Sequence, residues 1–137
     1  MIKIPTGISK EDVKKREEII YSFYDKWFKI NPTKKVYNIH LKEYINVRYI
    51  SVNETARHAA KQYLSTLAVL QLDSILATAK QFGAQRLIKE GVKNQRKFSK
   101  MLEMRCDLAG IGTIKLIVGI KKQSKEKVQY CITAITA

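Results

Sequence analysis

The sequence predicts an α+β fold in which N-terminal helices pack on one face of a curved, roughly four-stranded antiparallel C-terminal β-meander. Three observations lead to this prediction. The last part of the chain has two segments of alternating apolar and polar residues, joined by a charged turn. The first part instead carries apolar residues at helical spacing. A β-hairpin alone is only marginally stable in water, so the helices are expected to cover its apolar face.

The first region, residues 1–35, is expected to form an arm and one amphipathic helix. Ser9 stands three residues before Asp12, a pattern typical of a helix N-cap with an acid in the first turn. Apolar residues recur at helical spacing from Val13 to Phe28, and Asn31-Pro32 ends the helix because the residue before proline avoids the α region. The aromatic stripe of this helix is interpreted as core, since an isolated helix needs tertiary packing.

The second region, residues 36–137, is expected to complete the same single domain. With 137 residues, 45% of them apolar, the chain is long enough for one domain with a real core. Lys35 to Ser51 is interpreted as a short strand, a bend near Lys42-Glu43 and a second extended piece. A short helix from Leu41 to Arg48 remains the alternative.

Helices are expected next. Ser51 and Glu54 form a capping-box pattern, which predicts a helix from about Val52 to Val69. A continuation or a new helix follows, beginning near Asp73 and ending at Gly83.

Strands are expected from Arg86 onward, at Arg86–Glu90, at Met101–Leu108 and in a final hairpin over residues 113–135. Two sets of apolar residues at period two define the inner faces of that hairpin: Ile114, Leu116, Val118 and Ile120, then Val128, Tyr130, Ile132 and Ala134. In this register Gln129 and Thr133 face outward.

The net charge of +14, from 26 Lys plus Arg against 12 Asp plus Glu, indicates a polyanionic partner. Nucleic acid is the commonest such partner. The candidate phosphate-binding residues of the strand region are Lys93, Arg96, Lys97 and Lys100, followed by Lys121 and Lys122 in the hairpin turn. The alternative is that these lysines only solvate the surface.

The residue types argue against several kinds of chemistry. The two cysteines and two histidines contain no pair at zinc-ligand spacing, and Gly110-Ile-Gly112 lacks the rest of a phosphate-binding loop. Carboxylates are too sparse to favour a glycosidase or a two-metal site. Neither a metal nor a cofactor is therefore expected. Both cysteines are interpreted as reduced core thiols, and the lack of an apolar leader or membrane-length run predicts a cytoplasmic protein that does not enter membranes.

His58 is the leading catalytic candidate. Arg57 and Lys61 make its surroundings cationic, which lowers an imidazole pKa and favours the neutral base. Such a base, with Lys or Arg groups and sheet hydroxyls, suits metal-independent RNA cleavage. The base takes the ribose 2′-hydroxyl proton, cations stabilise the phosphorane, and an acid protonates the leaving 5′-oxygen. The competing interpretation is a histidine on a solvated helix face.

Four segments in order resemble phage and mobile-element members of the barnase/EndoU/colicin/RelE-like nuclease superfamily, in particular domains associated with large polyvalent phage proteins. They are Asn53-Glu-Thr-Ala-Arg-His58-Ala-Ala-Lys61, Leu76-Ala-Thr-Ala79, Lys115-Leu-Ile-Val-Gly-Ile120 and Val128-Gln-Tyr-Cys-Ile-Thr-Ala-Ile135. The resemblance covers roughly Val36 to Ile135 and implies helices followed by a curved sheet, with RNase activity. The site residues that it implies are His58, Lys61, Gln129 and Thr133, and Lys115 is a further candidate for approaching the phosphate.

Two functions are expected on this basis. One is a metal-independent endoribonuclease in which His58 is the base; if His40 is remote, Lys61 or a tyrosine must be the acid. The other is a non-catalytic nucleic-acid-binding or protein-interaction module of a mobile element. RNA is favoured as the nucleic acid, and an acidic protein such as an antitoxin is a further expected partner.

Overall fold

The computed structural model describes residues 3–88 and 95–135. The helices are α1 (Lys10–Ile30), α2 (Tyr49–Ala59), α3 (Tyr63–Val69) and α4 (Leu72–Thr78). The strands are β1 (Lys35–Asn38), β2 (Glu43–Asn46), β3 (Lys80–Gln81), β4 (Arg86–Leu87), β5 (Phe98–Leu108), β6 (Gly112–Lys121) and β7 (Lys127–Ala134). The predicted α+β fold, with helices before the long strands, is confirmed.

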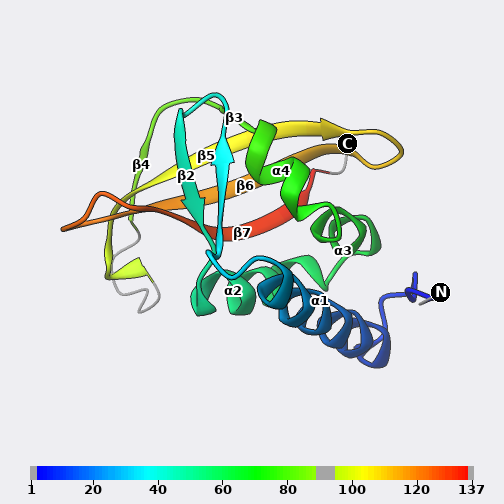
Figure 1. The fold of residues 1–137 in the computed structure, drawn as a ribbon. Helices are drawn as coiled ribbons and strands as arrows, with labels where there is room; N and C mark the ends of the chain where they lie inside the picture. The colour runs from blue at the N-terminus through cyan, green and yellow to red at the C-terminus, as the bar shows by residue number, and fades with distance from the viewer. Residues whose placement is uncertain (1–2, 89–94, 136–137) are drawn as a thin grey trace.

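The sheet is larger than predicted and mixed rather than purely antiparallel. Its order is β1-β2-β7-β6-β5-β3, and β4 also pairs with β5. The β1–β2 hairpin confirms the extended interpretation of that segment, and β2 then pairs in parallel with β7 at Ile45 and Asn46. The prediction of a purely antiparallel meander is wrong here because the hairpin between α1 and α2 supplies an edge of the sheet, and its second strand runs parallel to β7. Figure 1 shows the three long strands side by side, with α1 and α2 below β7.

The main core lies between the helices and one face of the long strands. The predicted inward set of β6, from Ile114 to Ile120, is buried there. Tyr24 and Trp27 of α1 are buried in the same core, so the interpretation of the aromatic stripe as core is confirmed. The indole nitrogen Nε1 of Trp27 donates to Asp73 Oδ1 at 2.8 Å, which ties α1 to the start of α4.

Helix α1 begins and ends as the sequence predicts. Ser9 is its N-cap, and the Ser9 Oγ accepts a hydrogen bond from the Asp12 backbone N–H at 3.1 Å. The helix ends at Ile30, directly before Asn31-Pro32.

The predicted capping box of the next helix is wrong. Helix α2 begins at Tyr49, so Ser51 lies inside the first turn and its Oγ accepts from the Arg48 backbone N–H at 2.9 Å. The same hydroxyl donates to the Gln129 carbonyl of β7. Ser51 therefore joins the helix to the strand, and Glu54 does not cap the helix.

The predicted long helix is also divided. Helix α2 ends at Ala59 and α3 starts at Tyr63. The buried Arg16 of α1 donates from Nε to the Ala60 carbonyl at 2.7 Å, which satisfies an acceptor exposed by the break. The helix predicted to begin near Asp73 and end at Gly83 corresponds to α4, which ends at Thr78.

A β-bulge in β7 changes which residues face the core. Ile117 pairs with Cys131 and Val118 pairs with Gln129, so Tyr130 is the extra residue. Before the bulge, Gln129 faces the helices; after it, Ile132 does. The prediction that Val128, Tyr130, Ile132 and Ala134 share one face is therefore wrong: the first two pack on the outer face with Phe98, Met101 and Ile117.

Candidate functional site

A pocket of about 420 Å³ lies where α2 and β4 meet the outer face of the long strands. We call it the His58 pocket. Its polar and thiol side chains come from α2 (Glu54, Arg57, His58), from β4 and the segment before β5 (Arg86, Gln95), and from β6 and β7 (Lys115, Tyr130, Cys131, Thr133). Sequence-distant elements thus bring basic, acidic and hydroxyl groups into one hollow.

The bulge of β7 builds the strand side of this pocket. Because Tyr130 is an extra residue, Tyr130 and Cys131 both reach the pocket although they are adjacent in the chain. Thr133 lies two residues further on, and its pairing partner on β6 is Lys115. β-Bulges next to functional sites often serve to redirect a side chain in this way.

Helix α2 builds the other side through its helical spacing. Glu54, Arg57 and His58 stand at i, i+3 and i+4, so they share one face of the helix. The Glu54 side chain is only 5% exposed, and its oxygens lie 3.7 Å from His58 Nε2 and 3.9 Å from Arg57 NH1. The Tyr130 hydroxyl interacts with the side chains of Glu54 and Gln95. A carboxylate thus lies at the centre of the site.

The His58 imidazole is half-buried and favours its neutral form. Burial is the largest cause that lowers its pKa below the ordinary 6.5. Glu54 opposes this change, whereas Arg57 and Lys61 add to it. The predicted direction is therefore confirmed, although burial outweighs the cationic neighbours named from the sequence.

The phenol and the thiol of the pocket keep their protons at neutral pH. Burial, the largest cause in each case, raises the pKa of Tyr130 to about 12 and that of Cys131 to about 11. Cys131 is therefore not a thiolate nucleophile at neutral pH. Tyr130 remains a hydrogen-bond donor.

The structure brings together four of the predicted site residues: His58, Arg57, Lys115 and Thr133 all line the pocket. Lys61 is exposed and is not among the lining residues.

Gln129 requires a correction. It is fully buried on the helix side of β7, where its Nε2 donates to Thr55 Oγ1 at 2.7 Å and to the Tyr24 hydroxyl at 2.8 Å. The predicted outward orientation is wrong because the bulge shifts the alternation by one residue. Gln129 is a structural residue of the core.

The predicted phosphate-binding residues separate into groups. Lys97, Lys121 and Lys122 line a hollow of about 400 Å³, which we call the lysine hollow. Arg96 and Lys100 are exposed but do not line it, and Lys93 lies outside the described residues.

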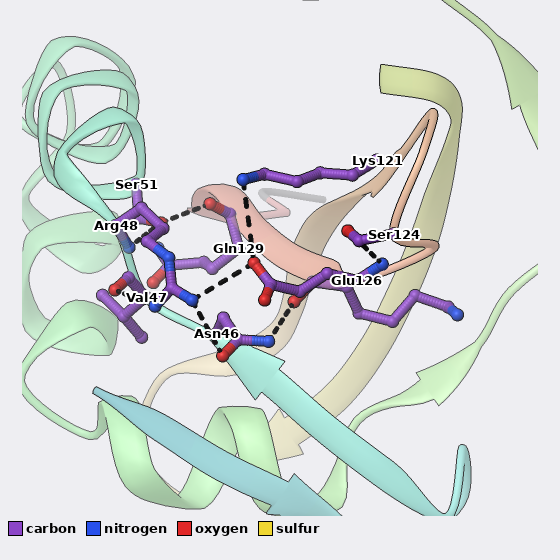
Figure 2. Close-up of polar contacts among 9 residues, drawn as sticks. Asn46, Val47, Arg48, Ser51, Lys121, Ser124, Glu126 and Gln129 are labelled. Carbon is purple, nitrogen blue, oxygen red and sulfur yellow. Dashed lines mark hydrogen bonds and ion pairs between the residues drawn. The ribbon is translucent and has the colours of Figure 1, made fainter. Parts of the chain in front are cut away.

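An ion-pair network connects the lysine hollow to the start of α2 (Figure 2). Glu126 Oε1 lies 3.2 Å from Arg48 NH2 and 3.8 Å from Lys121 Nζ. Arg48 NH2 also donates to Asn46 Oδ1 at 3.3 Å, and Asn46 Nδ2 donates to the Lys127 carbonyl at 3.1 Å. The network holds the β6–β7 turn close to the N-terminus of α2.

Sequence reasoning missed Glu54, Arg86 and Tyr130. The sequence pattern places Glu54 in a capping box and Tyr130 on the inner face of a regular strand. The i, i+4 spacing of Glu54 and His58 is the signal that could have paired them. Nothing in the local sequence places Arg86 across the pocket.

Comparison of the chain with known proteins identifies no family for it. The chain matches no protein-family model, and no curated protein or solved structure is significantly similar to it. Within residues 3–88 and 95–135, no three His, Cys, Asp or Glu side chains gather as a metal site. In the same residues, no helix has the length and apolar character needed to cross a membrane.

Proposed function

We propose that the protein is a metal-independent endoribonuclease, of the kind carried by phages and mobile elements, that acts on RNA in the cytoplasm. One observation carries the proposal. The half-buried imidazole, a carboxylate, a protonated phenol and several cations line one pocket on a strongly basic protein. Perturbed titratable groups that converge in a cleft are typical of catalytic sites.

In this proposal His58 is the general base. Its lowered pKa keeps the imidazole neutral at pH 7, ready to take the proton of the ribose 2′-hydroxyl. The 2′-oxygen attacks the adjacent phosphorus and the bond from phosphorus to the 5′-oxygen breaks. Tyr130 donates a proton to that leaving oxygen, because its phenol stays protonated. The products are a 2′,3′-cyclic phosphate and a 5′-hydroxyl, and proton exchange with solvent restores both residues.

Lys115 is the cation best placed to stabilise the phosphorane. Among the described residues it has no ion-pair partner, whereas Arg57 lies near Glu54 and Arg86 lies 3.7 Å from Glu103. A cation that is not already neutralised gives the larger stabilisation of charge that develops in the transition state. Thr133, opposite Lys115, supplies a hydroxyl that orients the phosphate.

The test is RNA cleavage in excess EDTA. Purified protein should cleave RNA under these conditions and leave 2′,3′-cyclic phosphate ends. An RNA with one 2′-deoxy nucleotide should resist cleavage at that position, because the nucleophile is missing. Cleavage that requires added divalent metal, or that leaves other ends, would contradict the proposal.

A second candidate function is nucleic-acid binding without catalysis, as a module of a mobile element. The exposed side chains of the lysine hollow favour it, since closely spaced ammonium groups suit phosphates. An acidic polypeptide such as an antitoxin would suit the same cations. Turnover in EDTA separates this function from the first, whereas binding alone does not.

A further inference from the structure

A third hollow, of about 580 Å³, adjoins the first two. Glu54 lines both this hollow and the His58 pocket, while Lys97 and Lys121 line both this hollow and the lysine hollow. The three hollows therefore follow one another along the molecule. We call the middle one the Tyr49 hollow, after the first residue of α2 that lines it.

Tyr49 is unusual among the aromatic residues of the chain. Its side chain is 79% exposed, the most of any tyrosine in the described residues, so the fold makes little use of the ring. Ile50, Phe98 and Val128 line the same hollow, with Phe98 and Val128 buried beneath its surface. The exposed, flat ring of Tyr49 offers a surface on which a planar molecule can stack.

Asn53 adds an oriented hydrogen-bond donor to this hollow. Its Oδ1 accepts from the Tyr21 hydroxyl at 2.8 Å, and the other terminal atom of the amide is the nitrogen Nδ2. In the part of the chain that the structure describes, that nitrogen has no hydrogen-bond partner. It can therefore donate to a carbonyl oxygen or ring nitrogen of a ligand in the hollow.

The charge of the hollow favours an anion beside the stacked group. Arg48, Lys97 and Lys121 line it together with one acid, Glu54, whose ion-pair partners Arg57 and His58 lie on the side of the His58 pocket. Glu126 pairs with Arg48 and Lys121 (Figure 2). Lys97 has no ion-pair partner among the described residues. A planar surface, a directed donor and an excess of cations together match one nucleotide of a nucleic acid.

We propose that the Tyr49 hollow is a nucleobase subsite of the groove that carries RNA to the His58 pocket. One base stacks on Tyr49, Asn53 contacts the edge of that base, and Lys97 and Lys121 hold the adjoining phosphate. This inference rests on the proposed function, because it takes the bound nucleic acid to be the RNA that the protein cleaves. It also defines the substrate class: the RNA is single-stranded, because bases within a duplex are already stacked on each other.

The experiment measures binding of a short 2′-O-methyl RNA, which has no free nucleophile, by fluorescence anisotropy. Tyr49→Ala should weaken binding about tenfold, the range of one lost base–aromatic stack. Tyr49→Phe should bind like wild type, because the ring is retained. Tyr44→Ala is the matched control: Tyr44 of β2 is 48% exposed and lines none of the three hollows. It should also bind like wild type.

A second probe isolates the base. On an oligomer of the same length with abasic sugars, Tyr49→Ala and wild type should bind equally. The subsite is overturned if Tyr49→Ala binds the full oligomer as tightly as wild type, or if it loses as much on the abasic oligomer. Because the 2′-O-methyl RNA is never cleaved, the binding result is independent of the EDTA cleavage assay. If the wild-type protein cleaves no RNA in EDTA, the catalytic proposal is wrong. If Tyr49→Ala binds the 2′-O-methyl RNA as tightly as wild type, the proposed subsite is wrong.

Discussion

The His58 pocket and the lysine hollow are both basic, yet they are built differently. In the pocket, groups of both signs face one another on α2, β4 and the long strands, and burial shifts the pKa values of His58, Tyr130 and Cys131. In the hollow, lysines surround the polar β6–β7 turn. Burial next to opposite charge prepares groups for proton transfer, whereas exposed cations attract a polyanion without changing it.

The cause of this difference lies in the backbone. At the pocket, the bulge at Tyr130 turns two successive side chains to the outer face and so concentrates chemistry there. At the turn, residues 122–125 are exposed, so their side chains remain in solvent. We expect substitutions in the pocket to change the rate of cleavage and those in the hollow to change affinity.

The largest effect is expected at His58. His58→Ala should lower the rate constant for RNA cleavage about 10²- to 10⁴-fold, the usual contribution of a general base, with little loss of RNA affinity. Single-turnover cleavage in EDTA and anisotropy measure the two quantities. His40→Ala is the control, since His40 is exposed and lines none of the three hollows. Equal cleavage rates for His58→Ala and His40→Ala would contradict a catalytic role for His58.

The pH dependence sharpens the same distinction. Because His58 acts as a base, kcat/KM should fall about tenfold per pH unit below the pKa of its imidazole and level off above it. Burial lowers that pKa, so the midpoint should lie below 6.5. Tyr130 should cause no decline until the pH approaches about 12. A midpoint above 6.5 would show that His58 is not buried in the way described.

The lysine hollow should respond in affinity. Replacement of Lys97, Lys121 and Lys122 by alanine should weaken binding of single-stranded RNA about tenfold. It should also reduce the slope of log affinity against log salt by about 2, because each phosphate contact releases about 0.7 counterion. The cleavage rate at saturation should not change.

The control for this variant removes the same charge elsewhere. Lys14, Lys15 and Lys29 are exposed on α1, and their replacement by alanine also lowers the net charge by three. If both triple variants lose the same affinity and slope, the hollow has no special role and only net charge matters.

The smallest functional effect is expected at Gln129. Gln129→Leu leaves the Tyr24 hydroxyl and Thr55 Oγ1 without their buried partner, which should lower the free energy of unfolding by about 1–3 kcal/mol. Denaturant titration measures this, with the exposed Gln123→Leu as control. The folded fraction should cleave RNA like wild type. If Gln129→Leu cleaves RNA more slowly than wild type but unfolds with the same free energy, Gln129 has a catalytic role and the structural account of it is wrong.

The sequence allowed the regular parts of the molecule to be predicted. Period-two alternation identified the final hairpin, and the Ser9 cap with Asn31-Pro32 bounded α1. The sequence placed Arg57 beside His58 as a cationic neighbour, and the strand register placed Lys115 and Thr133 on the outer face of the sheet. These features depend on local patterns, which a sequence displays directly.

The remaining features depend on tertiary contacts. The bulge is invisible to alternation because Tyr130, Cys131 and Ile132 are all apolar or weakly polar, so either register fits. The break after Ala59 contains no glycine or proline, and Arg16 satisfies a carbonyl there from a distant helix. Arg86 reaches the pocket only because the short strand β4 pairs with β5. Most of the pocket's unexpected members were therefore beyond local reasoning.

The central claim is that an RNA chain lies against the imidazole of His58. NMR tests it directly, because the chain has only two histidines and therefore two sets of imidazole signals. On titration with the non-cleavable 2′-O-methyl RNA, the His58 signals should shift and its pKa should rise, since a bound phosphate stabilises the imidazolium. The His40 signals should stay in place. His58 signals that do not move at saturating RNA would contradict the account.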